Sequence, residues 1–395
     1  MEVSGSGCGE RGSQHRRYAG DRLGVITAAP LWLARPSRFA GLTRTRARWV
    51  LALVAALLLG ALTSLGTAGP PPVSGDAASR ADDRADELLY ESIVESLRNG
   101  GEYYSTAAAA LRAGGYPMKP FVTFRLPTLA VVQAQVSPVV AALLLYGLAV
   151  TALYAWWQRL GAAFQRTPPR LVATVLAAGG MASAVQAELV AFHEVWAGVL
   201  IALSLVARRP GQWTTAVALG LSAMLIRETA ALYVGVMAMI ALLEGHRREF
   251  FAWVIATAVL AIVVALHANA VAEVVRPLDQ PSQGWAGMLG FGFAIKAMVL
   301  TTALALAPAA IGALLAGLAL VGWAGWRDPL ATRAVAILAA YAVLLSFFGR
   351  TDTFYWALLI APLVPVGLAF VPDTLRDLFR VALDRRRITV TRTAR

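Results

Sequence analysis

Residues 75–128 read GDAASRADDRADELLYESIVESLRNGGEYYSTAAAALRAGGYPMKPFVTFRLPT, a long polar stretch in an otherwise apolar chain. From Asp76 to Pro127 it holds 14 charged residues, eight of them acidic. Apolar runs lie on both sides of it. Most connections between helices are only about 4–6 residues long, and long ordered loops usually carry function. We therefore expect this stretch to form half of an active site.

The composition predicts the class of protein. The chain has 395 residues, of which 58% are hydrophobic and 15% charged, and its mean hydropathy is +0.62. Soluble domains have about half apolar and a quarter charged residues. Repeated apolar runs of about 20 residues indicate an all-α polytopic membrane protein. The single cysteine, Cys8, leaves no intrachain disulfide and no cysteine-based metal site.

The apolar runs predict about ten transmembrane helices. The first extends from Trp49 to about Gly66, too far from the N-terminus for a typical signal peptide, and the prolines at 70–72 end it. The others are expected near 129–156, 171–189, 192–207, 213–227, 229–243, 251–271, 297–323, 333–348 and 355–371. These runs divide the chain into a disordered basic tail (1–48), a membrane domain (49–371, with its first loop at 69–128) and a basic, amphipathic tail (372–395).

The distribution of charge predicts the orientation. If the N-terminus is cytoplasmic, the segments 1–48, 157–170, 208–212, 244–250, 324–333 and 372–395 are inside, and they contain 25 Lys and Arg against 9 Asp and Glu. The remaining segments hold 10 basic and 14 acidic residues. By the positive-inside rule both termini are cytoplasmic and the large loop is extracytoplasmic. The net charge of +12 then reflects topology and contact with anionic lipid, and nucleic acid is not an expected partner.

Ionisable residues near the outer ends of the helices are candidates for a site, because charges at membrane depth are costly. They come from five separate parts of the chain: Glu188, His193 and Glu194; Arg227 and Glu228; Asp279; Lys296; and Arg350 with Asp352. Each has a structural alternative. Arg227 and Glu228 could form an interfacial ion pair, His193 could anchor the interface, and Lys296 could extend to the lipid surface. No HExxH or similar metal-binding spacing is present.

The large loop itself reads as two helices and an extended segment. Residues 84–99 place apolar side chains on one stripe with acids opposite, which predicts an amphipathic helix along the outer leaflet. An alanine-rich helix is expected over 103–112, between two Gly-Gly pairs. The stretch YPMKPFVTFRLPT then brings Lys119 and Arg125 to the membrane surface.

These motifs resemble the GT-C superfamily of polytopic glycosyltransferases, which use polyprenyl-phosphate-linked sugars. The resemblance rests on the DE-x-x-Y start of the first loop helix (Asp86 to Tyr90), on G-x-YY, and on YPxKPFxxFRLP before the second span. Within this superfamily the chain is similar to the mannosyltransferase-like and aminoarabinose-transferase-like enzymes. The resemblance covers roughly residues 49–245.

The resemblance implies roles for particular residues. Asp86, with Glu87 beside it, would be the catalytic carboxylate, and Asp82 and Asp83 are alternatives. Lys119 and Arg125 would hold the donor phosphate, a role we also assign to Arg227 and Arg350. The base would activate a hydroxyl of a glycan, lipid or protein acceptor, and inversion would follow from a single displacement. For Asp86 the structural alternative is a solvated acid that favours the helix dipole. The sequence does not decide whether a divalent cation serves as a cofactor.

Two other functions fit a polytopic chain at the cell membrane. A transporter or flippase of lipid-linked or small solutes would have discontinuous helices, an inverted repeat and charges at the midplane. A glycan ligase, polymerase or acyltransferase would carry its main loop later in the chain. The charges near one interface favour the glycosyltransferase.

Overall fold

The structure is a computed structural model that describes residues 29–69 and 85–384. It is all-helical, with 75% helix and no strand among the described residues. The helices are α1 (Arg44–Leu62), α3 (Ala85–Arg98), α4 (Tyr103–Ala113), α5 (Thr128–Ala134), α6 (Pro138–Leu160), α7 (Thr167–Gly180), α8 (His193–Ala207), α9 (Thr214–Ile226), α10 (Ala231–Leu243), α11 (Arg247–Val274), α12 (Gly290–Leu300), α13 (Ala309–Gly325), α14 (Pro329–Phe348) and α15 (Val371–Leu383).

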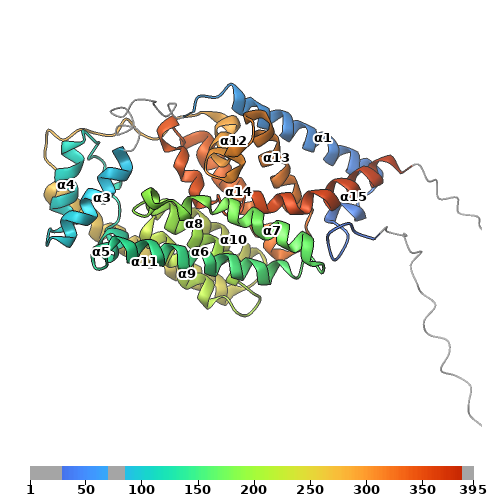
Figure 1. Ribbon diagram of the computed structural model, residues 1–395, viewed down its shortest axis with the longest axis horizontal. Coiled ribbons are helices and arrows are strands. Elements are labelled where there is room, and N and C mark those ends of the chain that lie inside the picture. Colours follow the sequence, from blue (N-terminus) through green and yellow to red (C-terminus); the bar gives the residue numbers. More distant parts are fainter. Residues whose placement is uncertain (1–28, 70–84, 385–395) are drawn as a thin grey trace, which may run out of the picture.

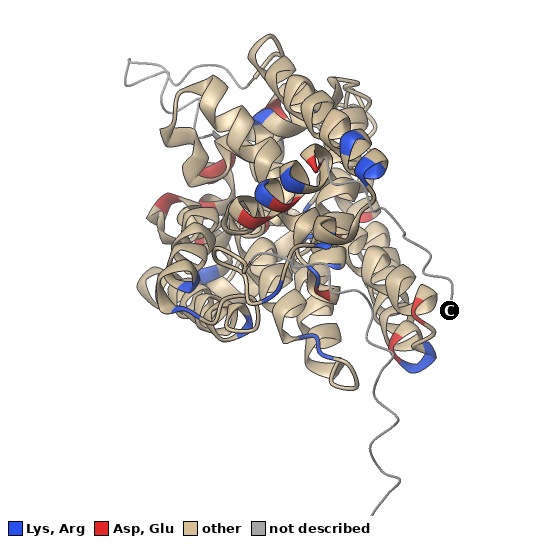
Figure 2. Ribbon diagram, turned by 90° about the vertical axis from the view of Figure 1, so that its right-hand side faces the viewer, with Lys and Arg blue, Asp and Glu red and all other residues tan. Residues whose placement is uncertain are grey.

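The loop helices and the chain ends lie at opposite ends of the molecule. Figure 1 shows α3 and α4 at one end of the long axis and α15 at the other, where the described chain also begins. Seen along this axis from the α15 end, charged positions are scattered over a mainly uncharged ribbon (Figure 2). Within the described residues, four helical segments are long and apolar enough to cross a membrane: Arg44–Leu65, Pro138–Leu160, Arg247–Val274 and Pro329–Phe348.

Four of the expected continuous spans are interrupted. In the run at 171–189, α7 ends at Gly180 and two short 3-10 segments follow. The run at 129–156 is divided into α5 and α6, because Ser137 caps a new helix that begins at Pro138. The run at 297–323 is divided into α12 and α13 by a 3-10 turn at Ala303–Leu306. There the Thr302 hydroxyl donates to the backbone carbonyls of Met298 and Val299. Pro308 has no backbone N–H and cannot donate an α-helical hydrogen bond.

The expected span at 355–371 is not an α-helix. It is replaced by two 3-10 segments, η8 (Thr351–Leu359) and η9 (Pro365–Phe370), because the prolines at 362 and 365 remove two donors. Most of this irregular backbone is buried, as membrane proteins require. A glycine of α8 permits the close approach: a Cβ at Gly198 would lie 2.2 Å from the Leu358 carbonyl oxygen.

Residues 29–48 have a defined structure, which corrects the expectation of disorder for this part of the N-terminal tail. The buried carboxylate of Asp373 in α15 accepts hydrogen bonds from three successive backbone amides, those of Leu31, Trp32 and Leu33, at 2.6–2.8 Å. Asp377 accepts another from Ser37 at 2.8 Å. Acids of the C-terminal helix therefore tie residues 29–43 to the bundle, an interaction that composition alone does not reveal. Residues 1–28 and 385–395 lie outside the described part.

Most of the apolar stripe of α3 is covered by protein, whereas the sequence predicts contact with the outer leaflet; Leu88 is 45% exposed. Leu89, Ile93 and Val94 pack with α4, with the extended segment and with Val271 of α11 in a small separate core. Arg98 at the end of α3 donates to the carbonyls of Gln133 in α5 and of Val136, just after α5. These contacts fix α3, and with it Asp86, relative to the membrane helices.

Candidate functional site

A cavity of about 560 Å³ lies between the large loop and the helix ends that face it. Its size is in the range of small-molecule sites. The walls come from α3, α4, the segment 115–125, the α9–α10 turn, the segment 280–285 and η8. The charged wall residues are Asp86, Arg125, Arg227, Glu228, Arg350 and Asp352, and the aromatic ones are Tyr90, Tyr103, Tyr116, Phe124, Trp285, Tyr355 and Trp356.

Asp86 enters the cavity from the first turn of α3. Tyr116, which follows the left-handed Gly115 (φ 68°), hydrogen-bonds to it. Burial, the charge of Asp86 and this bond together raise the pKa of the Tyr116 phenol, so the phenol is protonated and donates. The carboxylate is thereby held in the cavity wall, and Glu87 is not part of that wall.

A buried ion network supports the floor of the cavity. Glu194, fully buried in the first turn of α8, lies 2.5 Å from Nε of Arg227 and 3.5 Å from Nη2 of Arg125. Arg227 also pairs with Glu228. Arg125 donates to the Tyr90 hydroxyl at 3.0 Å. Because the two arginines have buried carboxylate or phenol partners, their positions are fixed by the fold.

Arg350 is held less firmly. Its Nη2 lies 3.1 Å from the Asp352 carboxylate, and its Nη1 donates to the Gly284 carbonyl at 3.1 Å. The Arg350 side chain is 30% exposed and that of Asp352 60%. Exposed ion pairs contribute only about 0–1 kcal/mol. A ligand can therefore displace Asp352 from Arg350 at small cost.

The charges of the cavity are balanced. Three arginines in the wall face three carboxylates, and Glu194 beneath the floor adds a fourth. There is no excess of positive charge to attract an anion. An anionic ligand must therefore replace an internal carboxylate as the partner of one arginine, and Arg350 has the weakest partner.

Several predicted residues lie away from the cavity. The Lys119 ammonium donates to the Pro277 carbonyl at 2.8 Å and does not line the cavity. Glu188 is exposed. His193 is buried in a separate small pocket beside Tyr90, and neither of its ring nitrogens has a protein partner. Asp82 and Asp83 lie outside the described residues.

No group of three or more His, Cys, Asp or Glu side chains capable of holding a metal gathers within residues 29–69 and 85–384.

The segment 275–285 closes one side of the cavity, a position that no local pattern in the sequence predicts. Arg112 of α4 makes a two-pronged contact with Asp279, at 2.8 Å to each carboxylate oxygen. Backbone bonds from Met118 to Gln280 and from Ser282 to Lys119 dock the segment on the large loop. The sequence contains one signal for this contact: Asp279 is an isolated acid in the loop between α11 and α12, where Arg276 is the nearby cation. Tyr116, Trp285 and Tyr355 were also missed, since aromatic residues are common at membrane interfaces.

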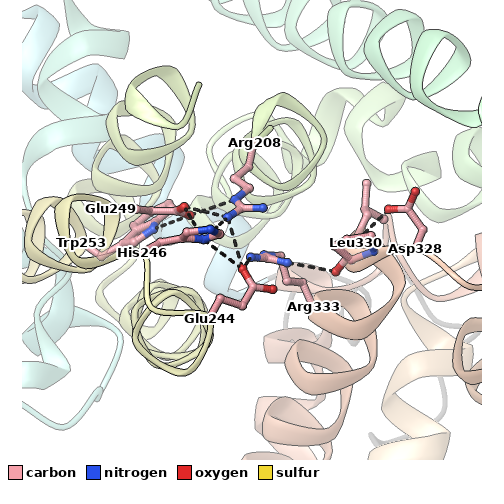
Figure 3. A network of polar contacts seen from close by, with 9 residues as sticks. Arg208, Glu244, His246, Glu249, Trp253, Asp328, Leu330 and Arg333 are labelled. Atoms are coloured by element: carbon pink, nitrogen blue, oxygen red, sulfur yellow. Dashed lines mark hydrogen bonds and ion pairs between the residues drawn. The ribbon is translucent and has the colours of Figure 1, made fainter. Parts of the chain in front are cut away.

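A second polar network lies at the C-terminal end of α8, whereas Glu194 is in the first turn of that helix; Figure 3 shows its side chains. Arg208, after α8, contacts Glu249 of α11 at 2.7 and 2.9 Å and Glu244 at 3.4 Å. Arg333 of α14 also pairs with Glu244, and His246 lies 3.2 Å from the same carboxylate. Four helices are joined here, far along the chain from the loop residues of the cavity.

Comparisons of the chain with models of known protein families, with curated proteins and with solved structures returned no match.

Proposed function

We propose that the protein is a membrane glycosyltransferase that moves a sugar from a polyprenyl-phosphate donor to an acceptor hydroxyl. The proposal depends mainly on one observation: the same cavity is lined by residues from three distant parts of the chain. These are Asp86 from the large loop, Arg227 from the α9–α10 turn and Arg350 from the last third of the chain. A carboxylate and a displaceable cation in an aromatic-lined cavity suit a sugar attached to a phosphate.

The residues support a single displacement. Asp86 accepts the proton of the acceptor hydroxyl as the hydroxyl oxygen forms a bond to the anomeric carbon. The bond between that carbon and the phosphate oxygen breaks, and the electron pair leaves with the phosphate. Arg350 stabilises the charge that develops on the leaving group, while Arg125 and Arg227 keep the floor in place. The configuration at the anomeric carbon inverts. General-base catalysis of this kind contributes about 10²–10⁴-fold.

The proposed topology places this cavity at the extracytoplasmic face of the cell membrane. The short helices α7 to α10, the pair α12–α13 and the segment η8–η9 complete ten crossings with the four long helices. By the positive-inside rule we assign the cytoplasmic side to the end that holds α15, because the segments expected inside carry 25 of the chain's Lys and Arg residues. The donor then reaches the cavity from the outer leaflet.

The direct test uses the purified protein in liposomes. Polyprenyl phosphates carrying different sugars are offered with a mixture of glycan, lipid and peptide acceptors, and free polyprenyl phosphate is measured by mass spectrometry. Protein-dependent release of polyprenyl phosphate with glycosylated product supports the proposal. Intact donors throughout, from protein that is folded by its melting curve, would count against it.

A transporter is the second candidate, because one observation favours it. Buried polar groups lie between the cavity and the second polar network: Tyr341 donates to the Thr229 carbonyl at 3.0 Å, and the Tyr233 and Ser204 hydroxyls lie 2.6 Å apart. Since Ser204 donates its proton to the Ala216 carbonyl, Tyr233 is the donor to Ser204. A transporter would move labelled solute into sealed liposomes without releasing polyprenyl phosphate.

A further inference from the structure

The rim of the cavity beside Arg350 joins a polar group to an apolar surface. Residues 284–288 run against the end of α14: the Met288 amide donates to the Phe347 carbonyl at 3.1 Å. A Cβ on Gly287 would lie 1.8 Å from the Gly349 carbonyl oxygen, so only glycine permits this contact. The two backbones form one continuous edge.

This edge has two chemically different faces. Trp285 and Arg350 are on the cavity side. Met288, Phe347 and Phe348 are on the outer side, with 67%, 49% and 50% of each residue exposed. Met288 has φ 49° and is the one non-glycine residue with positive φ in the described part of the chain. A side chain in this region costs of order 1 kcal/mol, a strain that is often found at ligand sites.

The two faces match the two parts of one ligand. The guanidinium of Arg350 is the wall cation with a weak, exposed partner, and arginine binds phosphate oxygens in a two-pronged geometry. An apolar strip that begins at the same edge suits a hydrocarbon chain. A ligand with both parts is a lipid phosphate.

We propose that the edge formed by Met288, Phe347, Phe348 and Arg350 is the lateral entry site for a single-chain lipid phosphate. Its phosphate replaces Asp352 at Arg350, and its first chain units lie over Met288 and the two phenylalanines outside the cavity. The inference rests on the proposed function and deepens it, because it assigns the donor phosphate to one of the four predicted cations and gives the lipid chain a position.

The first experiment measures binding without turnover. The purified protein in detergent is titrated with farnesyl phosphate, farnesol and inorganic phosphate. We expect farnesyl phosphate to bind best, and Arg350→Gln to weaken it about tenfold to hundredfold, because a charge-assisted contact is lost. Arg276→Gln is the matched control, since Arg276 is exposed in the neighbouring loop and does not line the cavity. Equal binding by Arg350→Gln and wild type would overturn the assignment.

The second experiment locates the chain in the wild-type protein. Farnesyl phosphate with a diazirine in its first isoprene units is photolysed on the protein in lipid nanodiscs, and labelled residues are mapped by mass spectrometry. We expect labels at Met288, Phe347 or Phe348 to exceed those at Ile262, an α11 residue that is 63% exposed, and to decline when unlabelled farnesyl phosphate competes. Uniform labelling of the lipid-facing helices would contradict the entry site.

The two proposals can fail separately. Specific binding and labelling with no sugar transfer from any donor leave the entry site standing and remove the transferase function. Transfer that persists in Arg350→Gln with unchanged affinity removes the entry site alone.

Discussion

The carboxylate of Glu194 and the guanidinium of Arg227 meet at 2.5 Å beneath the cavity, and both side chains are buried. This pair joins the start of α8 to the α9–α10 turn and also holds Arg125 at 3.5 Å. It keeps two of the cavity's arginines in position, so its main effect is on the structure of the site.

Removal of the charge of Glu194 should therefore destabilise the protein. Breaking one side of a buried ion pair typically costs about 3–5 kcal/mol, and we expect a cost toward the lower end because Arg227 would keep Glu228 as a carboxylate partner. We expect Glu194→Gln to lower the midpoint of thermal unfolding in detergent and to reduce the monodisperse fraction. Glu188→Gln is the control, since Glu188 is exposed. Equal melting curves for both variants would mean that the network does not stabilise the fold.

Tyr116 should affect the rate of transfer more than stability. Its phenol hydrogen-bonds to Asp86, and a hydrogen bond of this kind contributes about 0.5–1.5 kcal/mol. We expect Tyr116→Phe to lower kcat about two- to tenfold with an unchanged melting curve. Tyr154→Phe, which alters an exposed residue of α6, should leave kcat as in wild type. A normal kcat in Tyr116→Phe would show that the phenol does not position the carboxylate.

The docking of the segment 275–285 should be insensitive to pH until strongly acidic conditions. The hydrogen bonds from Arg112 and from the Arg276 amide lower the pKa of Asp279 from 3.8 to about 2. A lowered acid pKa stabilises the folded form above the ordinary pKa, and the stabilisation is lost as the pH falls through about 2. The rate of pepsin cleavage within the segment 275–285, measured between pH 4 and pH 2, reports how firmly the segment is docked.

In wild type, cleavage within 275–285 should increase as the pH approaches 2. The Asp279→Asn variant should already be cleaved rapidly at pH 4. Its amide has a single acceptor oxygen, so it cannot accept both hydrogen bonds that the Arg112 guanidinium donates to Asp279. Slow cleavage of Asp279→Asn at pH 4 would mean that other contacts alone hold the segment.

The N-terminal segment should contribute to stability through α15. Asp373 accepts three backbone hydrogen bonds and is fully buried. We expect Asp373→Asn to cost about 1–3 kcal/mol, seen as a lower melting midpoint and as proteolysis near residues 29–37. Glu273→Gln, at an exposed site, is the matched control. Resistance to proteolysis equal to wild type would contradict the role of Asp373.

The all-helical class and both helices of the large loop could be predicted from the sequence, because apolar runs and the α3 stripe have a clear periodicity. The interruptions at Pro308 and in η8–η9 were harder to predict, since an apolar run has the same hydropathy whether its backbone is α-helical or irregular. Within the site, Asp86, Arg125, Arg227 and Arg350 were predicted and line one cavity. Lys119 was predicted as a phosphate ligand, but its ammonium contacts a backbone carbonyl. Tertiary contacts such as Arg112 with Asp279 leave no local pattern in the sequence.

The most direct test of the account is the rate of sugar transfer by Asp86→Asn, measured with a radiolabelled polyprenyl-phosphate donor on protein that matches wild type in its melting curve. Glu91→Gln, at an exposed position of the same helix, is the control and should transfer sugar at the wild-type rate. If Asp86 is the general base, Asp86→Asn should lose about 10²–10⁴-fold in rate. Transfer by Asp86→Asn within a few-fold of wild type would contradict the central claim.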